Sequence, residues 1–315
     1  MRIVIVGPGA LGSLLAARFF LLYQENSRTG NDYPFLHLLD YRPERAEFLH
    51  SRGLLFEEGE RKVLCHPHVT VDPGVCRTGD VLFFCVKSTA VASALARVTP
   101  YLSSRTLLIA MQNGIGHLDA ISHSPCATGV GITSEGATLI GPGHVCYGGR
   151  GVTRLGLLSS RSDSSDKALE NIIALFNAAG MTAERTVEPL KDIWAKLFIN
   201  IGINALTAIH GCRNGELLNS PSTRKSIEKA VREAEMVAVA KNIPIDADPV
   251  QATFAVCKAT QHNISSMLQD VLQKRLTEID AINGAIVATG SELGIATPVN
   301  TELVRQVKEL EASYT

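Results

Sequence analysis

The chain opens with the stretch MRIVIVGPGALG, residues 1–12, in which a short β-branched apolar run leads into glycines at positions 7, 9 and 12. A run such as Ile3–Val6 is typical of a strand that is buried on both faces. The apolar segment Leu11–Leu22 follows at once and predicts a buried helix. This order of strand, tight turn and helix predicts the first unit of a parallel α/β sheet.

The spacing Gly7-x-Gly9-x-x-Gly12 gives each glycine a separate physical use. The first allows the tight turn, the second lets the backbone approach a pyrophosphate, and the third lets the helix pack close to the strand. N–H groups at the helix start then point at the phosphates. A second predicted strand, ending at Asp40, completes the context that a dinucleotide site requires. The residues expected to bind this cofactor through the turn are Gly7, Gly9, Ala10, Leu11 and Gly12.

The residues after the second strand give conflicting signals about the cofactor. Asp40 stands where a carboxylate would accept a hydrogen bond from the ribose 2′-hydroxyl of NAD. Arg42 and Arg45 follow closely, and either guanidinium could instead hold the 2′-phosphate of NADP. Arg45 could also be a solvated helix residue, whereas Arg42 is the better candidate for a cofactor contact. From these residues alone the choice stays open.

Two more predicted strands, Asp80–Val86 and Thr106–Met111, lead directly into polar residues. Ligands of open α/β sheets bind beyond the carboxyl ends of the strands. We therefore expect Lys87 at the ligand crevice, although an ordinary surface lysine is the alternative. Asn113 follows the next strand and could bind the nicotinamide ribose or the substrate, unless it is simply a turn residue before Gly114.

The rest of the chain divides into a mixed first part and a helical second part. The polar segments Glu25–Tyr33 and Arg161–Asp166 predict loops, and strand-like residues between 129 and 158 predict added strands that close the first domain. Helices are expected over Pro43–Arg52, Thr89–Val98, Lys167–Ala179, Pro189–Ile209, Ser222–Lys241, Asp248–Leu276 with a break, Glu278–Leu293, and from about Asn300 onward. We expect a Rossmann-type parallel sheet domain at residues 1–187 and an all-α domain at residues 188–315.

Three polar residues lie within the apolar helix that is expected after Glu188. Lys196, Asn200 and Asn204 are spaced at i, i+4 and i+8, and share one helical face because each step drifts by only ~40°. They either form a solvent-facing stripe or line a cleft, because burial without partners would be costly. In a cleft, partial desolvation would lower the pKa of the lysine and let it protonate a developing alkoxide.

A second polar group lies further along the chain. Asn263 and Ser266 stand at i and i+3, and Glu278 heads the next predicted helix. A carboxylate at a helix start is favourable on electrostatic grounds alone, which is the structural alternative for Glu278. His210 and His262 lack partners at metal-ligand spacing, so no metal site is predicted.

Composition excludes several classes of partner. The net charge of -1 and the aromatic content of 5% argue against nucleic acid and anionic membranes. No uninterrupted apolar stretch is long enough to predict a transmembrane helix. The seven cysteines include no C-x-x-C pair, which argues against a disulfide framework and favours a cytoplasmic location.

Together these motifs resemble the ketopantoate reductase, or 2-dehydropantoate 2-reductase, family. The matching stretches occur in the family's order at residues 7–12, 86–87, 112–114, 194–200, 204–208, 214–216, 263–270 and 277–284. The last two stretches are the most specific, because they are long and the fold alone does not explain them. The resemblance covers nearly the whole chain.

The resemblance implies that 2-dehydropantoate is reduced to pantoate, usually with NADPH, in pantothenate and coenzyme A biosynthesis. By position, Lys196 is similar to the family's general acid and Glu278 to the carboxylate that helps to bind the substrate hydroxyl. Lys87 is similar to the cleft lysine near the cofactor and the substrate. The substrate-positioning residues implied in this way are Asn113, Asn200, Asn204 and Ser266, and Asn263 is a further candidate.

Asp40 departs from the pattern, because many family members lack an acidic residue near the end of the second strand. We expect NADPH rather than NADH as the cofactor, although Asp40 argues for NADH. Two other functions remain open: reduction of a different branched 2-oxo acid, or NAD(P) sensing without catalysis. The expected partner is a small 2-oxo acid, and the protein is expected to be a monomer or a homodimer.

Overall fold

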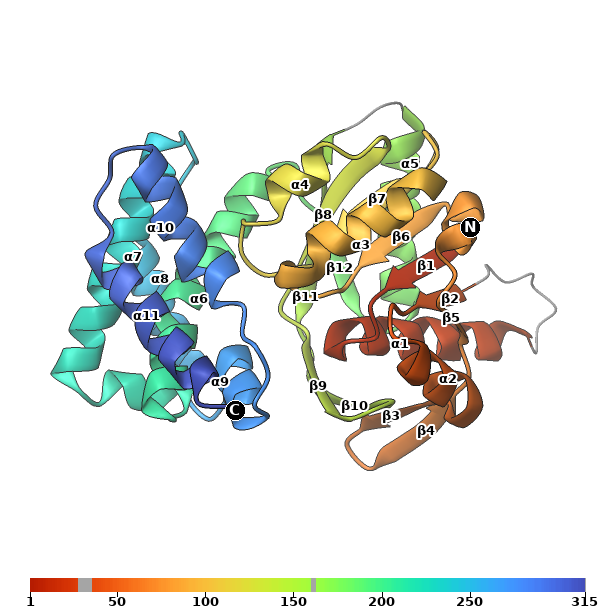
Figure 1. Ribbon diagram of the computed structural model, residues 1–315, viewed down its shortest axis with the longest axis horizontal. Helices are drawn as coiled ribbons and strands as arrows, with labels where there is room; N and C mark the ends of the chain where they lie inside the picture. Colours follow the sequence, from red (N-terminus) through yellow and green to blue (C-terminus); the bar gives the residue numbers. More distant parts are fainter. Residues whose placement is uncertain (28–35, 160–162, 315) are drawn as a thin grey trace. The chain divides into compact units, whose positions relative to one another are not determined.

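The computed structural model describes residues 1–27, 36–159 and 163–314 (Figure 1). It divides into two compact units, one formed by Met1–Gln112 and Leu118–Pro189 and the other by Asn113–His117 and Leu190–Thr315. The first unit is built on a largely parallel sheet and the second on helices. The predicted fold class, an α/β domain followed by an all-α domain, is confirmed.

The main sheet of the first unit has eight strands among the described residues, in the order β12-β11-β8-β7-β6-β1-β2-β5. They are β1 Ile3–Val6, β2 Leu36–Leu39, β5 His68–Thr70, β6 Val81–Phe84, β7 Leu107–Ala110, β8 Ala127–Thr133, β11 Val152–Ser159 and β12 Thr182–Arg185. All neighbours from β5 to β8 run parallel, whereas β11 runs antiparallel to β8. The strand order reverses between β1 and β6, so their carboxyl ends form the switch point where such sheets bind ligands.

The helices of this unit pack around the sheet (Figure 1). They are α1 Ala10–Ser27, α2 Pro43–Arg52, α3 Val91–Val98, α4 Leu118–Ser122 and α5 Asp163–Ala178, with the 3-10 turns η1 Pro73–Thr78, η2 Ser88–Ala90 and η3 Thr99–Tyr101. The rings of Phe19, Phe83 and Phe176 meet with centroids 5.4 to 5.9 Å apart. This contact joins α1 and α5 to the sheet and fixes where α1, with the glycine turn before it, begins.

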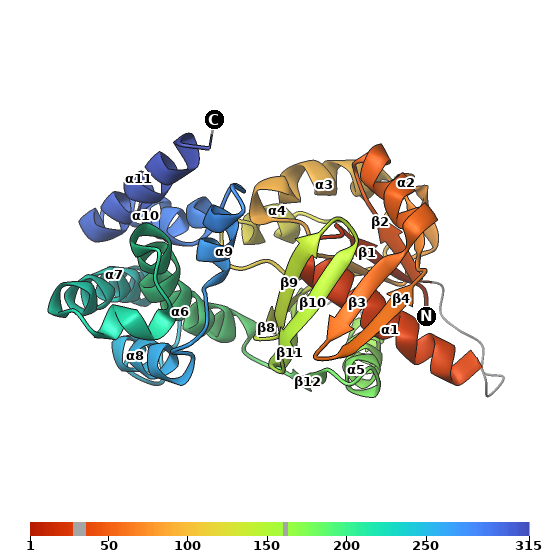
Figure 2. The ribbon, with the colours of Figure 1, turned by 90° about the horizontal axis from the view of Figure 1, so that it is seen from below.

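A second, four-stranded sheet lies beside α1 (Figure 2). It consists of β4 Arg61–Cys65, β3 Leu54–Glu58, β10 His144–Gly149 and β9 Gly136–Gly141. The guanidinium of Arg18 on α1 lies 4.9 Å from the ring centre of Phe56 and 4.7 Å from that of Tyr147, and bonds Glu58 at 2.7 Å. Added strands near residues 129–158 were predicted correctly, but β3, β4 and this separate sheet were not.

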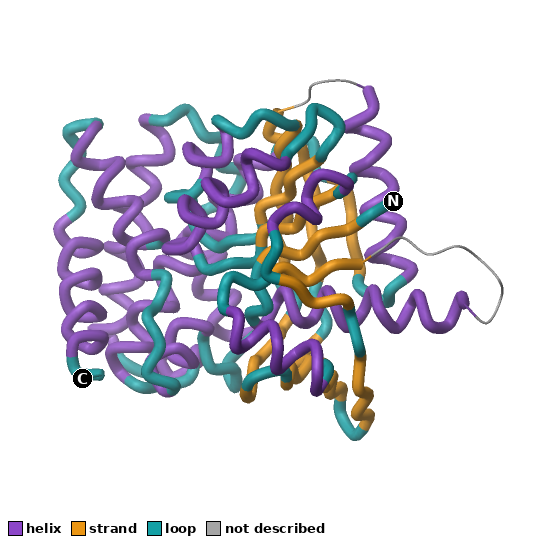
Figure 3. Tube along the Cα trace, turned by 45° about the vertical axis from the view of Figure 1, so that its right-hand side comes forward, coloured by secondary structure: helices purple, strands orange, loops and turns teal. Residues whose placement is uncertain are grey.

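The second unit is helical throughout its described elements (Figure 3). They are α6 Pro189–His210, whose first residue lies in the first unit, α7 Pro221–Ala240, α8 Pro249–Ala259, α9 Ser266–Leu272, α10 Asn283–Glu292 and α11 Pro298–Ala312, with the turns η4 Asn214–Leu218 and η5 Ile279–Ala281. The predicted break within Asp248–Leu276 is the gap between α8 and α9.

Three sequence-based expectations were wrong in detail. Helix α1 continues to Ser27, so residues 25–27 are helical, and residues 28–33 of the expected loop lie outside the described part. Helix α5 begins at Asp163, inside the expected loop, whose residues 161–162 are also outside. Acidic residues in a first helical turn favour this earlier start. Glu278 does not head a helix: it precedes η5, and α10 begins at Asn283.

Helix α6 is the apolar core element of the second unit. By length and hydropathy alone it could cross a membrane, but 67% of its most apolar window is buried within the protein. The core helix of a soluble protein has the same property, and α6 contributes residues such as Trp194, Leu197 and Ile201 to the core of its unit.

Candidate active site

In the turn between β1 and α1, packing requires glycine at two of the three glycine positions, Gly7 and Gly12. Gly7 has a φ of +100°, and a Cβ there would lie 2.7 Å from Val86 Cγ1. A Cβ at Gly12 would lie 2.1 Å from the carbonyl oxygen of Gly7. Any side chain at either position would therefore push apart the turn, the helix and the segment that follows β6.

Gly9 is different, because a Cβ there would meet only the carbonyl oxygen of Cys85, at an ordinary 3.6 Å. The fold itself does not need a glycine at this position. The N–H groups of Ala10, Leu11 and Gly12 lie in the first turn of α1, where a helix supplies no intrahelical acceptor. Because Gly9 has no side chain and lies beside these N–H donors, a pyrophosphate could approach the backbone closely at this position.

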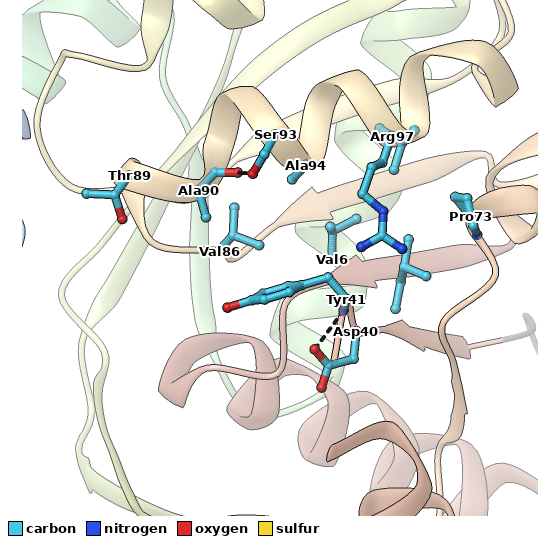
Figure 4. Close-up of a pocket in the computed structure, with 12 residues that line it drawn as sticks. Val6, Asp40, Tyr41, Pro73, Val86, Thr89, Ala90, Ser93, Ala94 and Arg97 are labelled. Atoms are coloured by element: carbon cyan, nitrogen blue, oxygen red, sulfur yellow. Dashed lines mark hydrogen bonds between the residues drawn. The ribbon is translucent and has the colours of Figure 1, made fainter. Parts of the chain in front are cut away.

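A pocket of about 360 Å³ lies at the carboxyl ends of β1 and β2 (Figure 4). Its walls come from the ends of these strands, the segment after β6, and α3. Arg97 reaches into it from α3 and Tyr41 extends from the end of β2 (Figure 4). Its other lining residues are Val6, Leu39, Asp40, Pro73, Val86, Thr89, Ala90, Ser93, Ala94 and Val98. A pocket of this size and mostly apolar lining suits the nucleoside end of a dinucleotide.

The buried carboxylate of Asp40 is hydrogen-bonded by its own neighbours in the chain. Its Oδ1 accepts hydrogen bonds from the backbone N–H of Tyr41 at 2.7 Å and of Arg42 at 3.1 Å. Arg45 donates from Nη2 to Oδ1 at 2.6 Å and from Nε to Oδ2 at 2.5 Å. Burial lowers the pKa of Arg45, but the hydrogen bonds and charge of Asp40 outweigh this effect, so the pKa lies above its ordinary value. Arg45 is therefore the partner of Asp40 and not a solvated helix residue.

Arg42 and Lys87 are the other two cationic residues that the sequence suggests for the cofactor. Arg42 is exposed, and its guanidinium lies 5.4 Å from the ring centre of Tyr41. Lys87 follows β6 and is half-buried at the start of η2. Gln112, which sequence reasoning gave no role, donates from its amide to the carbonyl oxygens of Phe84 at 2.8 Å and Val86 at 3.0 Å. It thereby fixes the segment that leads to Lys87.

The second unit brings together three of the predicted site residues. The side-chain amide of Asn113 donates to Glu278 Oε2 at 3.0 Å. Lys196 lies on α6, and desolvation lowers its pKa to about 8 although the charge of Glu278 raises it. Asn113 was assigned from sequence to the first domain, but Asn113–His117 belongs to the helical unit, where Ile115 N donates to Ala281 O at 3.3 Å.

The remaining candidates differ in exposure. Asn200 is half-buried one turn after Lys196, whereas Asn204 is 5% exposed. Ser266 is exposed at the start of α9. Asn263 is also exposed, and its carbonyl oxygen accepts a bond from Asn214 N at 3.1 Å.

Sequence reasoning missed the contact that joins α9 to α6. The hydroxyls of Thr207 and Ser265 lie 2.6 Å apart, and Ser265 Oγ also accepts a bond from Leu268 N at 3.1 Å. A serine that precedes a predicted helix is a standard N-cap signal, and could have pointed to Ser265.

Comparison with known proteins assigns this arrangement to a family. The family model described as ketopantoate reductase PanE/ApbA matches residues 3–160, and the model of its C-terminal part matches residues 189–311. The chain belongs to the ketopantoate reductase family. The 2-dehydropantoate 2-reductase of Halobacterium salinarum is 32% identical over 312 residues, which is 98% of each chain. As a family member the protein is an oxidoreductase.

Solved structures of similar proteins share the whole architecture. A PanE/ApbA family ketopantoate reductase from Ralstonia eutropha has a TM-score of 0.87 and 27% identity, over 100% of this chain and 99% of that chain. A D-mandelate dehydrogenase in complex with NADH and anilino(oxo)acetate also has a TM-score of 0.87, with 26% identity over the same shares. Proteins with this fold therefore include both a ketopantoate reductase and a D-mandelate dehydrogenase.

Proposed function

We propose that this protein reduces 2-dehydropantoate to pantoate with NADPH. The observation that carries the proposal is the grouping of Lys196 with the hydrogen-bonded pair Asn113 and Glu278 in one unit. Desolvation lowers the pKa of Lys196 to about 8, and the charge of Glu278 acts on it. Because the catalytic pKa of an ideal acid lies near the working pH, such a lysine can give up a proton readily. The family and the curated relative from Halobacterium salinarum support the same reaction.

In this proposal each side chain acts on one part of the substrate. NADPH, when bound, supplies the hydride. Lys196 stabilises the ketone oxygen and protonates it as an alcohol forms, and Glu278 accepts a hydrogen bond from the substrate hydroxyl. Donor side chains hold the carboxylate and fix the orientation, which supplies rate by proximity. These positioning residues are Asn113, Asn200, Asn204, Asn263 and Ser266.

The proposed preference for NADPH rests on the state of Asp40. Its carboxylate is bonded to Arg45 and to two backbone N–H groups, which compete with a ribose 2′-hydroxyl for its oxygens. Arg42, exposed beside it, and Arg97, which lines the pocket, offer guanidinium groups to a 2′-phosphate. Gly7, Gly9, Ala10, Leu11 and Gly12 would hold the pyrophosphate, and Lys87 and Asn113 would contact the cofactor toward its nicotinamide end.

We further propose that the reaction belongs to pantothenate and coenzyme A biosynthesis in the cytoplasm. The seven cysteines, all within the described residues, are free thiols, which fits a reducing compartment.

A second candidate is the reduction of a different 2-oxo acid. The structural similarity to a D-mandelate dehydrogenase complex favours it, because that enzyme has the same fold over the whole chain.

Turnover with purified protein tests the proposal. Oxidation of NADPH and, separately, of NADH is followed with 2-dehydropantoate and with an aryl 2-oxo acid. Faster turnover of 2-dehydropantoate with NADPH supports the proposal, whereas preference for the aryl acid supports the second candidate. Cofactor binding without turnover of either acid would favour a sensing role and contradict both.

Lys196→Ala supplies the matching control. We expect turnover to fall by about 10²–10⁴-fold, the usual contribution of a positioned general acid, while NADPH still binds. Near-normal turnover in this variant would remove Lys196 from the proposed role.

A further inference from the structure

Glu278 lies in a short segment whose backbone is bonded on both sides of it. Before it, Thr277 donates from both its N–H and its hydroxyl to Glu311 Oε1, each at 2.7 Å. After it, Ile279 N donates to the hydroxyl oxygen of Thr277 at 3.2 Å. The two neighbours of Glu278 are therefore joined to each other and to one buried carboxylate, because Thr277 is 2% and Glu311 8% exposed.

Glu311 can remain charged in this buried position because its oxygens are satisfied. Burial raises its pKa, but the donors of Thr277 and the ammonium of Lys308 lower it below its ordinary value. Lys308 Nζ lies 3.2 Å from Glu311 Oε2 and donates to Asp280 Oδ2 at 2.5 Å. A buried carboxylate with these partners accepts hydrogen bonds more strongly than a neutral group would.

The same helix, α11, also holds the far end of the segment. Asn283 donates from its side-chain amide to Asn300 Oδ1 at 2.9 Å, and Asn300 in turn donates to the buried carboxylate of Glu233 at 2.7 Å. Asn300 and Glu311 are close to three helical turns apart, so they share a face of α11 to within ~20°. Residues 277–283 are thus bonded at both ends to one face of α11, and Glu278 lies between these two points of attachment.

We propose that Thr277 and Glu311 are positioning residues that hold Glu278 beside Lys196 and Asn113. This inference rests on the proposed function, in which Glu278 binds the substrate hydroxyl. Without the Thr277–Glu311 contact the backbone on both sides of Glu278 is released, and its carboxylate moves relative to α6 and the Asn113 loop. A displacement of about 1 Å in a catalytic group can cost about 10²-fold in rate.

The test compares Thr277→Val, which keeps the shape and removes the hydroxyl, with Thr277→Ser, which keeps the hydroxyl. We expect Thr277→Val to lower kcat about 10-fold to 100-fold with an unchanged KM for NADPH, and Thr277→Ser to restore it. The alkaline limb of the pH profile should also move to lower pH, because the charge of Glu278 raises the pKa of Lys196. Thr253→Val is the matched control, since this buried hydroxyl donates to Pro249 O within its own helix, α8.

Unchanged kcat and pH profile in Thr277→Val would overturn the inference, as would an equal effect of Thr253→Val. If Thr277→Val does not fold, Lys308→Met decides: this partly exposed lysine contacts Asp280 and Glu311, and its loss should shift kcat and the pH limb in the same direction. An unaltered Lys308→Met enzyme would then overturn the inference.

Failure of the proposed function is recognised separately. If the wild-type protein does not reduce 2-dehydropantoate, the pH dependence of Lys196 acetylation, followed by mass spectrometry, replaces turnover as the measurement. A lower apparent pKa of Lys196 in Thr277→Val than in the wild type and Thr277→Ser supports the positioning role, and identical values contradict it.

Discussion

The side-chain amide of Asn113 donates a 3.0 Å hydrogen bond to the carboxylate of Glu278, although 165 positions separate the two residues in the chain. Asn113 follows strand β7 and Glu278 precedes the turn η5, so neither belongs to a regular element. The bond fixes one carboxylate oxygen of Glu278 while its charge acts on Lys196. The geometry makes the three residues one electrostatic unit.

Removing the amide donor should therefore weaken catalysis. We expect Asn113→Ala to lower kcat/KM for the 2-oxo acid about 10-fold to 100-fold, because a hydrogen bond to a charged group contributes roughly 1.5–3 kcal/mol. Asn113→Asp, of equal size, places a second carboxylate beside Glu278 and should be worse. Steady-state kinetics with saturating NADPH measure both, and wild-type kcat/KM in Asn113→Ala would contradict the role.

The pKa of Lys196 predicts the pH dependence of the reaction. A lysine acting as the acid must be protonated, so reduction should be fastest below pH 8 and fall as the pH rises through the value of about 8. Oxidation in the reverse direction should show the opposite dependence. Glu278→Gln removes the charge that raises this pKa, so its alkaline limb should lie at lower pH. A limb that does not move would show that the two side chains are not coupled.

The pair Asp40 and Arg45 predicts how cofactor preference can be changed. Arg45→Ala frees the Asp40 carboxylate to accept a bond from a ribose 2′-hydroxyl and to repel a 2′-phosphate. We expect the ratio of kcat/KM for NADPH to that for NADH to fall at least tenfold, about 1.4 kcal/mol. Arg42→Ala, which leaves the pair intact, should weaken NADPH alone. An unchanged ratio in Arg45→Ala would place the specificity elsewhere.

The glycine turn offers a pair of variants that separates folding from binding. Gly12→Ala brings a Cβ to 2.1 Å from Gly7 O and should lower Tm strongly or prevent folding. Gly9→Ala meets nothing closer than 3.6 Å and should fold with a nearly normal Tm, yet raise the KM for NADPH by blocking the pyrophosphate. Thermal unfolding and cofactor titration test both variants. Equal Tm losses would show that Gly9 also serves packing.

Local sequence was sufficient where the structural cause is local. The turn at Gly7–Gly12 lies between a strand and a helix that its own residues specify, and β1 and the start of α1 formed as predicted, although α1 continues to Ser27. The helix face with Lys196 and Asn200 likewise follows from spacing alone. Strands β3 and β4 were not predicted, because β4 is mostly exposed and lacks the apolar run of a buried strand.

Long-range contacts explain the remaining differences. Glu278 was expected to start a helix, but Thr277 is held by Glu311, which lies 34 positions further along the chain. The bidentate contact between Arg45 and Asp40 is a feature that no spacing rule contains. Asn113 follows a strand, as predicted, but packs with helical residues because Ile115 bonds Ala281.

The assignment of residues 113–117 to the helical unit affects how the gene can be divided. A truncated protein that starts at residue 190 would contain α7 to α11 and nearly all of α6. It would lack the strap Asn113–His117, which bonds Glu278 and Ala281. Sequence boundaries and spatial boundaries therefore disagree in this protein. Any attempt to express, transplant or evolve the helical half by itself must carry the strap with it, by fusion or by circular permutation.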